Sequence, residues 1–252
     1  MILRAMFFRV MFFRPMFFRA KCFNAVYSGL SSALLILNVA VWPASAQPRP
    51  ATEEIIRITF TSFKQALMGR DGVIAASHID DETAALYETI RQSALNAPKA
   101  ELLKSKLSFL VAVLSVRHHF TKNDIRNITG RELYGKTVSI GDTSSAMGFE
   151  ALSVLKVTPD RSGQSATADL GLEGRPETFQ IKFVNRKGRW YIALMDLITV
   201  SSDEFQARFG ITSKTSADTV EHVIVQYMYP ALAQLSGRPV TDAVWTPLNQ
   251  RK

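Results

Sequence analysis

Between Phe149 and Leu197 the sequence falls into four short apolar segments, and this pattern constrains the fold more than any other. In the middle segments apolar and polar residues alternate, which is typical of strands with one buried and one wet face. The joins, at 159–163, 174–176 and 185–188, are rich in turn-forming Pro, Gly, Asn and Asp. They are too short for the crossovers that parallel strands need. The segments therefore predict an antiparallel β-meander, covered by the helices before and after it in an α+β fold.

The last segment is apolar on both faces, because Trp190, Ile192 and Leu194 alternate with other apolar residues. Such a strand is expected at the centre of a sheet, covered on both sides. The alternation also places Asp196 on the Trp190 face, where partial burial would make a carboxylate a stronger base. Asp196 is therefore a candidate functional acid, and a strand-end aspartate in water is the alternative.

Helical spacing precedes the meander. Thr52 and two following glutamates indicate a capped helix that buries Ile56, Phe60, Phe63 and Leu67 and ends near Gly69. Asp80 and Asp81 introduce a second helix over 85–94, and Pro98 opens a third.

From Leu107 to Val116 that third stretch is apolar almost all round, which predicts a buried helix, with a buried strand as the alternative. Thr121 begins a capping-box match, and Gly130 is expected to close that short helix. Thr137 to Ile140 is expected to be a strand.

After the meander, Ser201 to Glu204 is expected to begin a short helix that ends at Gly210. Thr215 to Asp218 is expected to cap the last helix, which Pro230 should kink. One face of that helix is predicted to hold Val220, Ile224, Tyr227, Ala231 and Leu235.

Residues 1–46 have the order of a secretory signal peptide: a basic region, an apolar run from Leu30 to Trp42, and Ala44-Ser45-Ala46 ahead of Gln47. We expect cleavage between Ala46 and Gln47 and a periplasmic or secreted product. A retained membrane anchor is the alternative, although the run is shorter than the roughly 20 residues that span a bilayer.

The basic region repeats Met-Phe-Phe-Arg every five residues, so the start codon stays open among Met1, Met6, Met11 and Met16. After the leader we expect a spacer over 47–51, a single domain over 52–248 and a tail over 249–252.

Removal of the leader changes the charge balance. It holds five of the 30 basic residues and none of the 22 acidic ones, so the rest of the chain has a formal charge of +3. A balance this small does not favour nucleic-acid binding, which needs a clustered basic face. The one cysteine, Cys22, lies in the leader, so neither disulfides nor thiol chemistry are expected beyond it.

The surrounding sequence excludes a phosphate-binding loop and a metal site. Residues 130–137 match the phosphate-loop pattern, but such a loop follows a buried strand and opens a helix, whereas here a capped helix precedes and a strand is expected to follow. The four histidines have neither cysteines nor ligand spacing to form a metal site, and Arg117, His118 and His119 are better explained as cations at a helix end. We expect no metal and no cofactor.

The order of elements resembles that of exported bacterial members of the nuclear transport factor 2-like superfamily. The features that carry the resemblance are helices followed by an antiparallel sheet, the strand pair at 179–183 and 190–194 with Gly188 in its turn, and the closing 235–248 segment. It implies a cone-shaped α+β domain with helices closing a bent sheet around a pocket.

Enzymes of that superfamily place an acid or base inside the cone, and here only Asp196, with Tyr87 as hydrogen-bond donor, is a candidate for this role. Arg91, one helical turn after Tyr87, and Trp190 are the candidate ligand-binding residues, with a helix-surface pair as the alternative for Tyr87 and Arg91.

The leading expectation is a noncatalytic exported domain that binds a small apolar ligand or a protein partner, with a homodimer as one expected assembly. An acid–base enzyme acting on a lipophilic substrate is the second reading. The third is a membrane-tethered assembly factor, which requires that the leader be retained.

Overall fold

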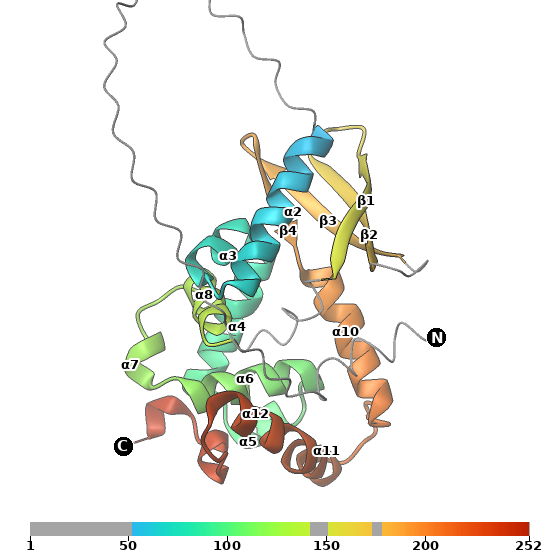
Figure 1. Cartoon of the computed structure of the whole chain (residues 1–252). Helices are drawn as coiled ribbons and strands as arrows, with labels where there is room; N and C mark the ends of the chain where they lie inside the picture. Colours follow the sequence, from blue (N-terminus) through green and yellow to red (C-terminus); the bar gives the residue numbers. More distant parts are fainter. Residues whose placement is uncertain (1–51, 142–150, 173–177, 252) are drawn as a thin grey trace, which may run out of the picture.

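A computed structural model describes residues 52–141, 151–172 and 178–251, and in it the chain is an α+β protein (Figure 1). The expected leader, its cleavage site and the spacer lie outside the described residues. The sheet has the strands β1 (Leu152–Pro159), β2 (Ser165–Leu172), β3 (Thr178–Arg186) and β4 (Arg189–Ala193). The helices before the sheet are α2 (Thr52–Met68), α3 (Gly72–His78), α4 (Asp81–Asn96), α5 (Lys99–Leu102), α6 (Leu107–His119), α7 (Lys122–Ile125) and α8 (Gly130–Ser139). Those after it are α10 (Met195–Arg208), α11 (Ala217–Val223), the π-helix η1 (Ile224–Met228), α12 (Tyr229–Ser236) and the 3₁₀-helices η2 (Asp242–Trp245) and η3 (Leu248–Gln250).

The predicted antiparallel meander is confirmed, with strand order β1-β2-β3-β4 in an open sheet. Its inner face is apolar, and α2 lies across it (Figure 1). The residues that fill this interface are at most 4% exposed: Ile56, Phe60, Phe63 and Leu67 from α2, and Ala166, Ala168, Leu170, Ile181, Phe183, Trp190 and Ile192 from the sheet. The inner face is therefore occupied by a helix of the chain itself.

The expected central position of the last strand is wrong, because β4 is an edge of the sheet. Its free side is covered only in part, by a parallel bridge between Ile79 and Ile192 and by a hydrogen bond from the Asp80 N–H to the Ile192 carbonyl. Leu194 lies beyond the strand, and its N–H donates to the Thr83 hydroxyl at 3.1 Å. The other face of this segment carries Tyr191, Ala193 and Met195, which line a cleft beside the α3–α4 junction instead of packing under a second layer.

The other edge strand, β1, is covered by two long cations from α2. The Arg57 guanidinium donates to the carbonyls of Val154 and Leu155, where the register of β1 slips. The Lys64 ammonium donates to the Leu152 carbonyl at 3.0 Å. These bonds satisfy backbone acceptors that an edge strand otherwise leaves unpaired.

The predicted buried helix is confirmed as α6, and its strand alternative is wrong. The helical stretch from Pro98 is interrupted between α5 and α6, so it forms two helices. Leu107, Leu110, Val113 and Leu114 of α6 are at most 1% exposed and lie in a second core with α4, α11 and the C-terminal 3₁₀-helices.

The predicted strand over Thr137 to Ile140 is wrong, because these residues end α8. Gly130 does not close a helix either: Thr129 and Glu132 form a second capping box, and α8 begins at Gly130. The phosphate-loop match therefore lies within one continuous helix, which cannot wrap a phosphate as a loop does. Its glycines serve close packing instead, since a Cβ on Gly135 would lie 2.7 Å from the Gly72 carbonyl oxygen.

Helix α10 begins at Met195, earlier than the predicted start near Ser201, and ends just before Gly210, whose φ is +63°. Figure 1 shows it running from the sheet to the helical end of the molecule. There its Gln206 side chain accepts from the Leu107 N–H at 3.0 Å, and its Ser202 hydroxyl lies 2.7 Å from that of Ser108. Helix α10 thereby caps the start of α6.

The predicted last helix is divided by the π-helix η1, directly before Pro230 at the start of α12. Proline lacks an N–H and collides with the carbonyl four residues earlier, so a wider turn accommodates it. The wider turn changes the helical register. Tyr227 and Leu235 are therefore 45% and 46% exposed, whereas Val220 and Ile224 of the predicted apolar face are buried.

Candidate binding cleft

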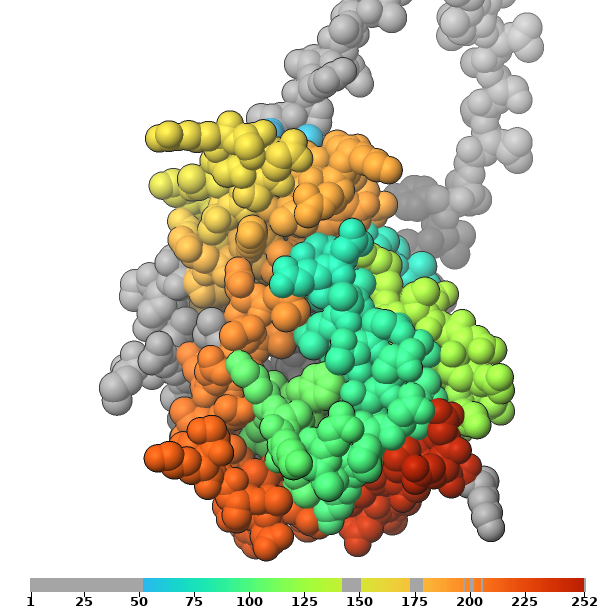
Figure 2. Space-filling view, turned by 180° about the vertical axis from the view of Figure 1, so that it is seen from behind, coloured from blue at the N-terminus to red at the C-terminus, as the bar shows by residue number. Residues whose placement is uncertain are grey.

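A cleft of about 600 Å³ lies between the α3–α4 junction and the outer face of the β3–β4 hairpin. Figure 2 views this side of the molecule, where the teal surface of α3 and α4 meets the orange surface of the hairpin and α10. Its lining residues are Ser77, Asp80, Asp81, Glu82, Arg131, Lys182, Val184, Arg186, Arg189, Tyr191, Ala193, Met195 and Asp196. Eight of these thirteen residues are Asp, Glu, Lys or Arg, so the cleft is rich in charged side chains.

The sheet wall of the cleft is basic because of strand register. Phe183 and Ile192 point to the inner face, so their neighbours along the strands point outward. The cross-strand pairs of this outer face are Lys182–Ala193, Val184–Tyr191 and Arg186–Arg189. Arg189 lies with its guanidinium 5.2 Å from the centre of the Tyr191 ring and donates to the Ser77 carbonyl at 2.9 Å. That bond ties the hairpin to the end of α3.

The helix wall is acidic because α4 begins there. Asp80 is 6% exposed and caps α4 by accepting from the Thr83 N–H at 3.0 Å. Asp81 and Glu82 follow in the first helical turn, where carboxylates are favoured by the helix dipole, and both are exposed. Arg131 of α8 reaches this wall, bonding the Asp81 carboxylate at 2.8 Å and the carbonyls of Ala76 and Ile79.

The prediction for Asp196 is wrong in its environment. The residue does not continue β4 onto the inner face but lies in the first turn of α10, where it is exposed. The strand ends at Ala193, so the period-two alternation no longer applies at position 196. Asp196 does line the cleft, at the mouth formed by the start of α10.

Tyr87 does not line this cleft. It is half-buried, and its ring meets the Tyr134 ring edge to face at 5.0 Å, between the two cores. Burial raises the pKa of the Tyr134 hydroxyl well above its usual value. The cleft thus holds Asp196 without the expected tyrosine donor.

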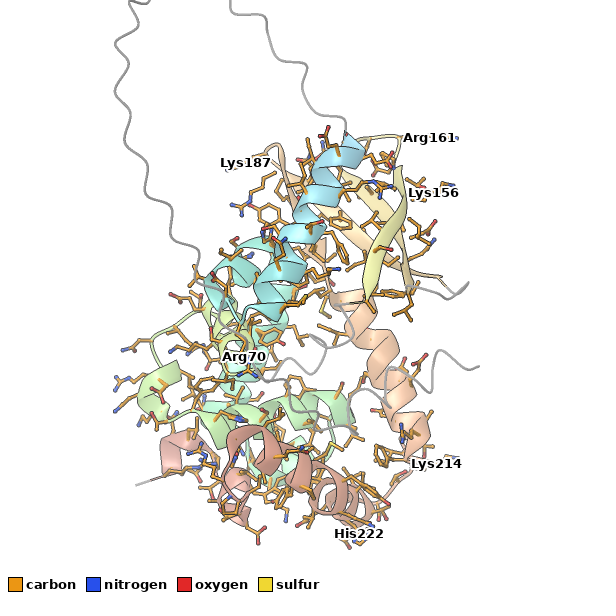
Figure 3. The ribbon with its side chains drawn as sticks, in the orientation of Figure 1. Arg70, Lys156, Arg161, Lys187, Lys214 and His222 are labelled. Atoms are coloured by element: carbon orange, nitrogen blue, oxygen red, sulfur yellow. The ribbon has the colours of Figure 1, made fainter. Side chains whose placement is uncertain are left out.

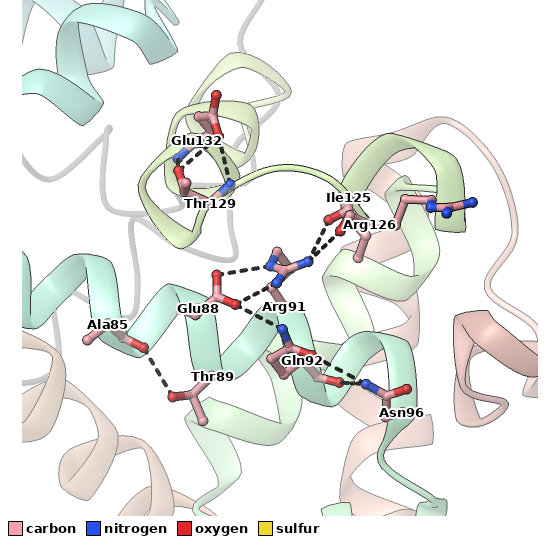
Figure 4. A network of polar contacts seen from close by, with 10 residues as sticks. All are labelled: Ala85, Glu88, Thr89, Arg91, Gln92, Asn96, Ile125, Arg126, Thr129 and Glu132. Atoms are coloured by element: carbon pink, nitrogen blue, oxygen red, sulfur yellow. Dashed lines mark hydrogen bonds and ion pairs between the residues drawn. The ribbon is translucent and has the colours of Figure 1, made fainter.

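Arg91 anchors two helices to each other (Figure 4). Its guanidinium bonds both carboxylate oxygens of Glu88 and donates to the carbonyls of Ile125 and Arg126 at 3.0 Å each. The hydrogen bond from Arg91 is the largest cause that lowers the pKa of Glu88. Arg91 is 7% exposed and Trp190 is 4% exposed within the inner core, so neither side chain is presented to a ligand in the cleft.

Arg117 is a buried cation that sequence reasoning placed at the end of α6 but did not recognise as a structural centre. It is 1% exposed, and its five N–H groups point at backbone carbonyls. The acceptors are Ser93, Ala94 and Ala97 at the end of α4, and Val244 and Trp245 in η2. Burial, and secondarily the charge of Arg251, lower its pKa to about 10.

His118 differs from the predicted helix-end cation. Its Nε2 lies 2.7 Å from the Ser236 hydroxyl, and burial, with help from neighbouring cations, lowers its pKa to about 4. The ring is therefore neutral near pH 7. A smaller hollow of about 200 Å³ adjoins it, lined by Arg117, Arg238 and Arg251 among others. The three guanidiniums donate mainly to backbone carbonyls, which is a structural use of arginine.

Sequence reasoning also missed a serine–histidine pair. The Ser62 hydroxyl of α2 lies 2.9 Å from Nε2 of His78 at the end of α3. Burial, and then the nearby Arg189 charge, lower the pKa of His78. Its Nδ1 is buried without a hydrogen-bond partner among the described residues, whereas a catalytic histidine is oriented by a third group at that atom. The pair therefore lacks the arrangement of a hydrolase.

Across the described residues, no group of three or more His, Cys, Asp or Glu side chains is placed to hold a metal ion. Within the same part of the chain, no helix has the length and apolar character needed to cross a membrane. Comparison with models of protein families, with curated proteins and with solved structures found no match to this chain.

Proposed function

We propose that the chain is an exported, noncatalytic binding protein that holds a protein partner in the cleft between α4 and the β3–β4 hairpin. The observation that supports this most strongly is that a wall with Asp80, Glu82 and the Asp81–Arg131 ion pair faces a basic wall with Lys182 and Arg189. A polypeptide segment with side chains of both signs complements such a cleft, and charge complementarity of this kind gives specificity more than raw affinity.

A protein partner is favoured over a small apolar ligand by the state of the inner face. In a cone-shaped domain an apolar ligand would lie between the sheet and its covering helix, but here Phe60, Phe63 and Phe183 occupy that space at 0–2% exposure. The relation to the nuclear transport factor 2-like superfamily remains part of the proposal. Its support is an antiparallel meander whose inner face is covered by a long helix.

The test is a charge swap that leaves the net charge unchanged. Glu82→Lys with Lys182→Glu exchanges one exposed charge on each wall. As the control, called the α5 swap, Glu101→Lys with Lys104→Glu makes the same exchange in α5 and in the turn that follows it. A photo-crosslinking amino acid at Tyr191 should give an adduct of defined mass in the host, which the cleft swap abolishes and the α5 swap preserves. Circular dichroism confirms that both variants fold.

The result that would overturn the proposal is an adduct that survives the cleft swap. Native mass spectrometry of the purified protein adds a second criterion: a retained small molecule with no protein adduct would favour the apolar-ligand reading. An adduct of twice the chain mass would identify the partner as a second copy of the chain.

A further inference from the structure

The sheet has one end at which three segments of the chain meet. In a four-stranded meander the β1–β2 and β3–β4 turns lie at the same end, and the pairing of Ser165 with Val184 places them side by side. Helix α2 begins at this end too, because Arg57 bonds the carbonyl of Leu155 while Lys64, two turns later, bonds that of Leu152. We call this region, with both turns and the start of α2, the turn end.

The turn end carries more basic than acidic side chains, although the start of α2 adds Glu53, which pairs with Arg57, and the exposed Glu54. Lys156, Arg161, Arg186 and Lys187 are exposed there, and none forms an ion pair with another described residue. Figure 3 shows Arg161 and Lys187 on either side of the start of α2, with Lys156 beside β1. Over 152–172 and 178–193 the sequence has six Lys or Arg and two Asp or Glu, a formal charge of +4.

Two acidic residues of the sheet lie near these cations. Asp169 is opposite Lys156 in the β1–β2 register and accepts from the Gln180 side chain at 2.9 Å, whereas Asp160 is held by its own turn. Asp160 accepts from the hydroxyls of Ser162 and Ser165 and from the Gln164 N–H. These bonds lower its pKa to about 2. Lys187 is held outward by a two-residue turn, since Lys187 and Gly188 both have positive φ, at 53° and 82°.

The position of the turn end in the chain suggests what faces it. The apolar run Leu30–Trp42 is separated from Thr52 by the nine residues 43–51, three of which are proline. Nine extended residues span at most about 30 Å. Whenever that run is inserted in a bilayer, either during export before cleavage or as a retained anchor, the start of α2 is kept close to the lipid surface.

We propose that the turn end docks on an anionic lipid surface, through Lys156, Arg161, Arg186 and Lys187. Basic residues near an anionic membrane each strengthen binding about fivefold, and the effect decays within a Debye length. Four such residues on one end are enough to orient the domain with the cleft at its side. This inference does not depend on the proposed partner, because Lys156, Arg161 and Lys187 do not line the cleft.

The test uses protein purified from cells that express the whole chain, its N-terminus read by intact mass. Flotation with vesicles of phosphatidylcholine alone, and with 30% phosphatidylglycerol, measures the anionic preference as a ratio of affinities. This ratio is informative even where a retained apolar run binds both kinds of vesicle. The turn-end variant is Lys156→Gln, Arg161→Gln and Lys187→Asn, asparagine being chosen because it tolerates positive φ.

The matched control removes three exposed charges elsewhere: Lys122→Gln, Arg126→Gln and Lys214→Gln. We expect the turn-end variant to lose about 100-fold of the anionic preference, the control to stay within threefold of the wild type, and 300 mM salt to abolish the preference. Equal losses in the two variants, or no preference for anionic vesicles, would overturn the proposal. So would tighter binding to a 20-base-pair DNA duplex than to the vesicles, because it would identify a nucleic acid as the ligand.

Discussion

Replacing Arg117 with methionine tests the largest buried polar contact in the helical layer. Methionine keeps most of the apolar stem but removes all five donors, so five carbonyls at the end of α4 and in η2 lose their partner. At roughly 1.5 kcal/mol for each hydrogen bond to a charged group, this loss is about 7.5 kcal/mol.

Part of that loss is offset, because the mutant no longer buries a charge. The pKa of Arg117 falls from 12.5 to about 10, which at about 1.4 kcal/mol per pKa unit corresponds to roughly 3.5 kcal/mol of unfavourable burial. The net expectation for Arg117→Met is a loss of about 4 kcal/mol in the free energy of unfolding.

Urea unfolding followed by circular dichroism gives the measurement. Arg117→Lys is the control, since an ammonium retains the charge but has only three donors, and it should lose about half as much. A methionine variant within 1 kcal/mol of the wild type would refute the reasoning. It would show that water or rearranged backbone satisfies the carbonyls, as happens when apolar residues replace some buried ionic groups without loss.

Three other predictions follow from the fold. The pKa of His118 is lowered from 6.5 to about 4, so below pH 6.5 the unfolded chain binds a proton more readily than the folded one. The free energy of unfolding should therefore fall by about 2–3 kcal/mol as the pH is lowered from 7.5 to 4.5. In urea titrations, His118→Gln should reduce this dependence on pH. Gly72→Ala places a Cβ 1.9 Å from the Gly135 carbonyl oxygen and should lower the free energy of unfolding by about 3 kcal/mol. Gly163→Ala adds its Cβ in open space but at φ +67°, so it should lower the same quantity by only about 1 kcal/mol. Thr129→Ala removes a capping box and should lower the thermal midpoint by the equivalent of about 1 kcal/mol; an unchanged midpoint would contradict this.

The parts of the fold that follow from local periodicity were predictable. Alternation identified β2 and β3, and the all-round apolar run identified α6. Prediction failed where tertiary contacts compete with local preference. The residues Thr137 and Val138 favour a strand, but the helix that the local Thr129–Glu132 capping box begins continues through them, and the close contact between Gly135 and Gly72 packs it against α3.

The candidate cleft was less predictable than the fold. Its walls come from residues near 80 and near 190. No local sequence pattern indicates that two segments about 100 positions apart will face each other. Asp196 was found by its sequence position but assigned to the wrong face, because the alternation was continued past Ala193 into α10. The buried Arg117 had no sequence signal beyond its place after an apolar run.

The contacts of Arg117 also lead us to expect an order of assembly. The sheet closes within some forty residues through neighbouring strands, a topology of short loops that can form early. Arg117 instead joins carbonyls 20 to 24 positions before it to carbonyls 127 and 128 positions after it. Until Val244 and Trp245 arrive, a guanidinium at the centre of the helical layer lacks two acceptors. A nascent chain, or one that lacks its C-terminal residues, would therefore have a complete sheet but an incompletely packed helical layer. Limited proteolysis can distinguish such a state from the native protein.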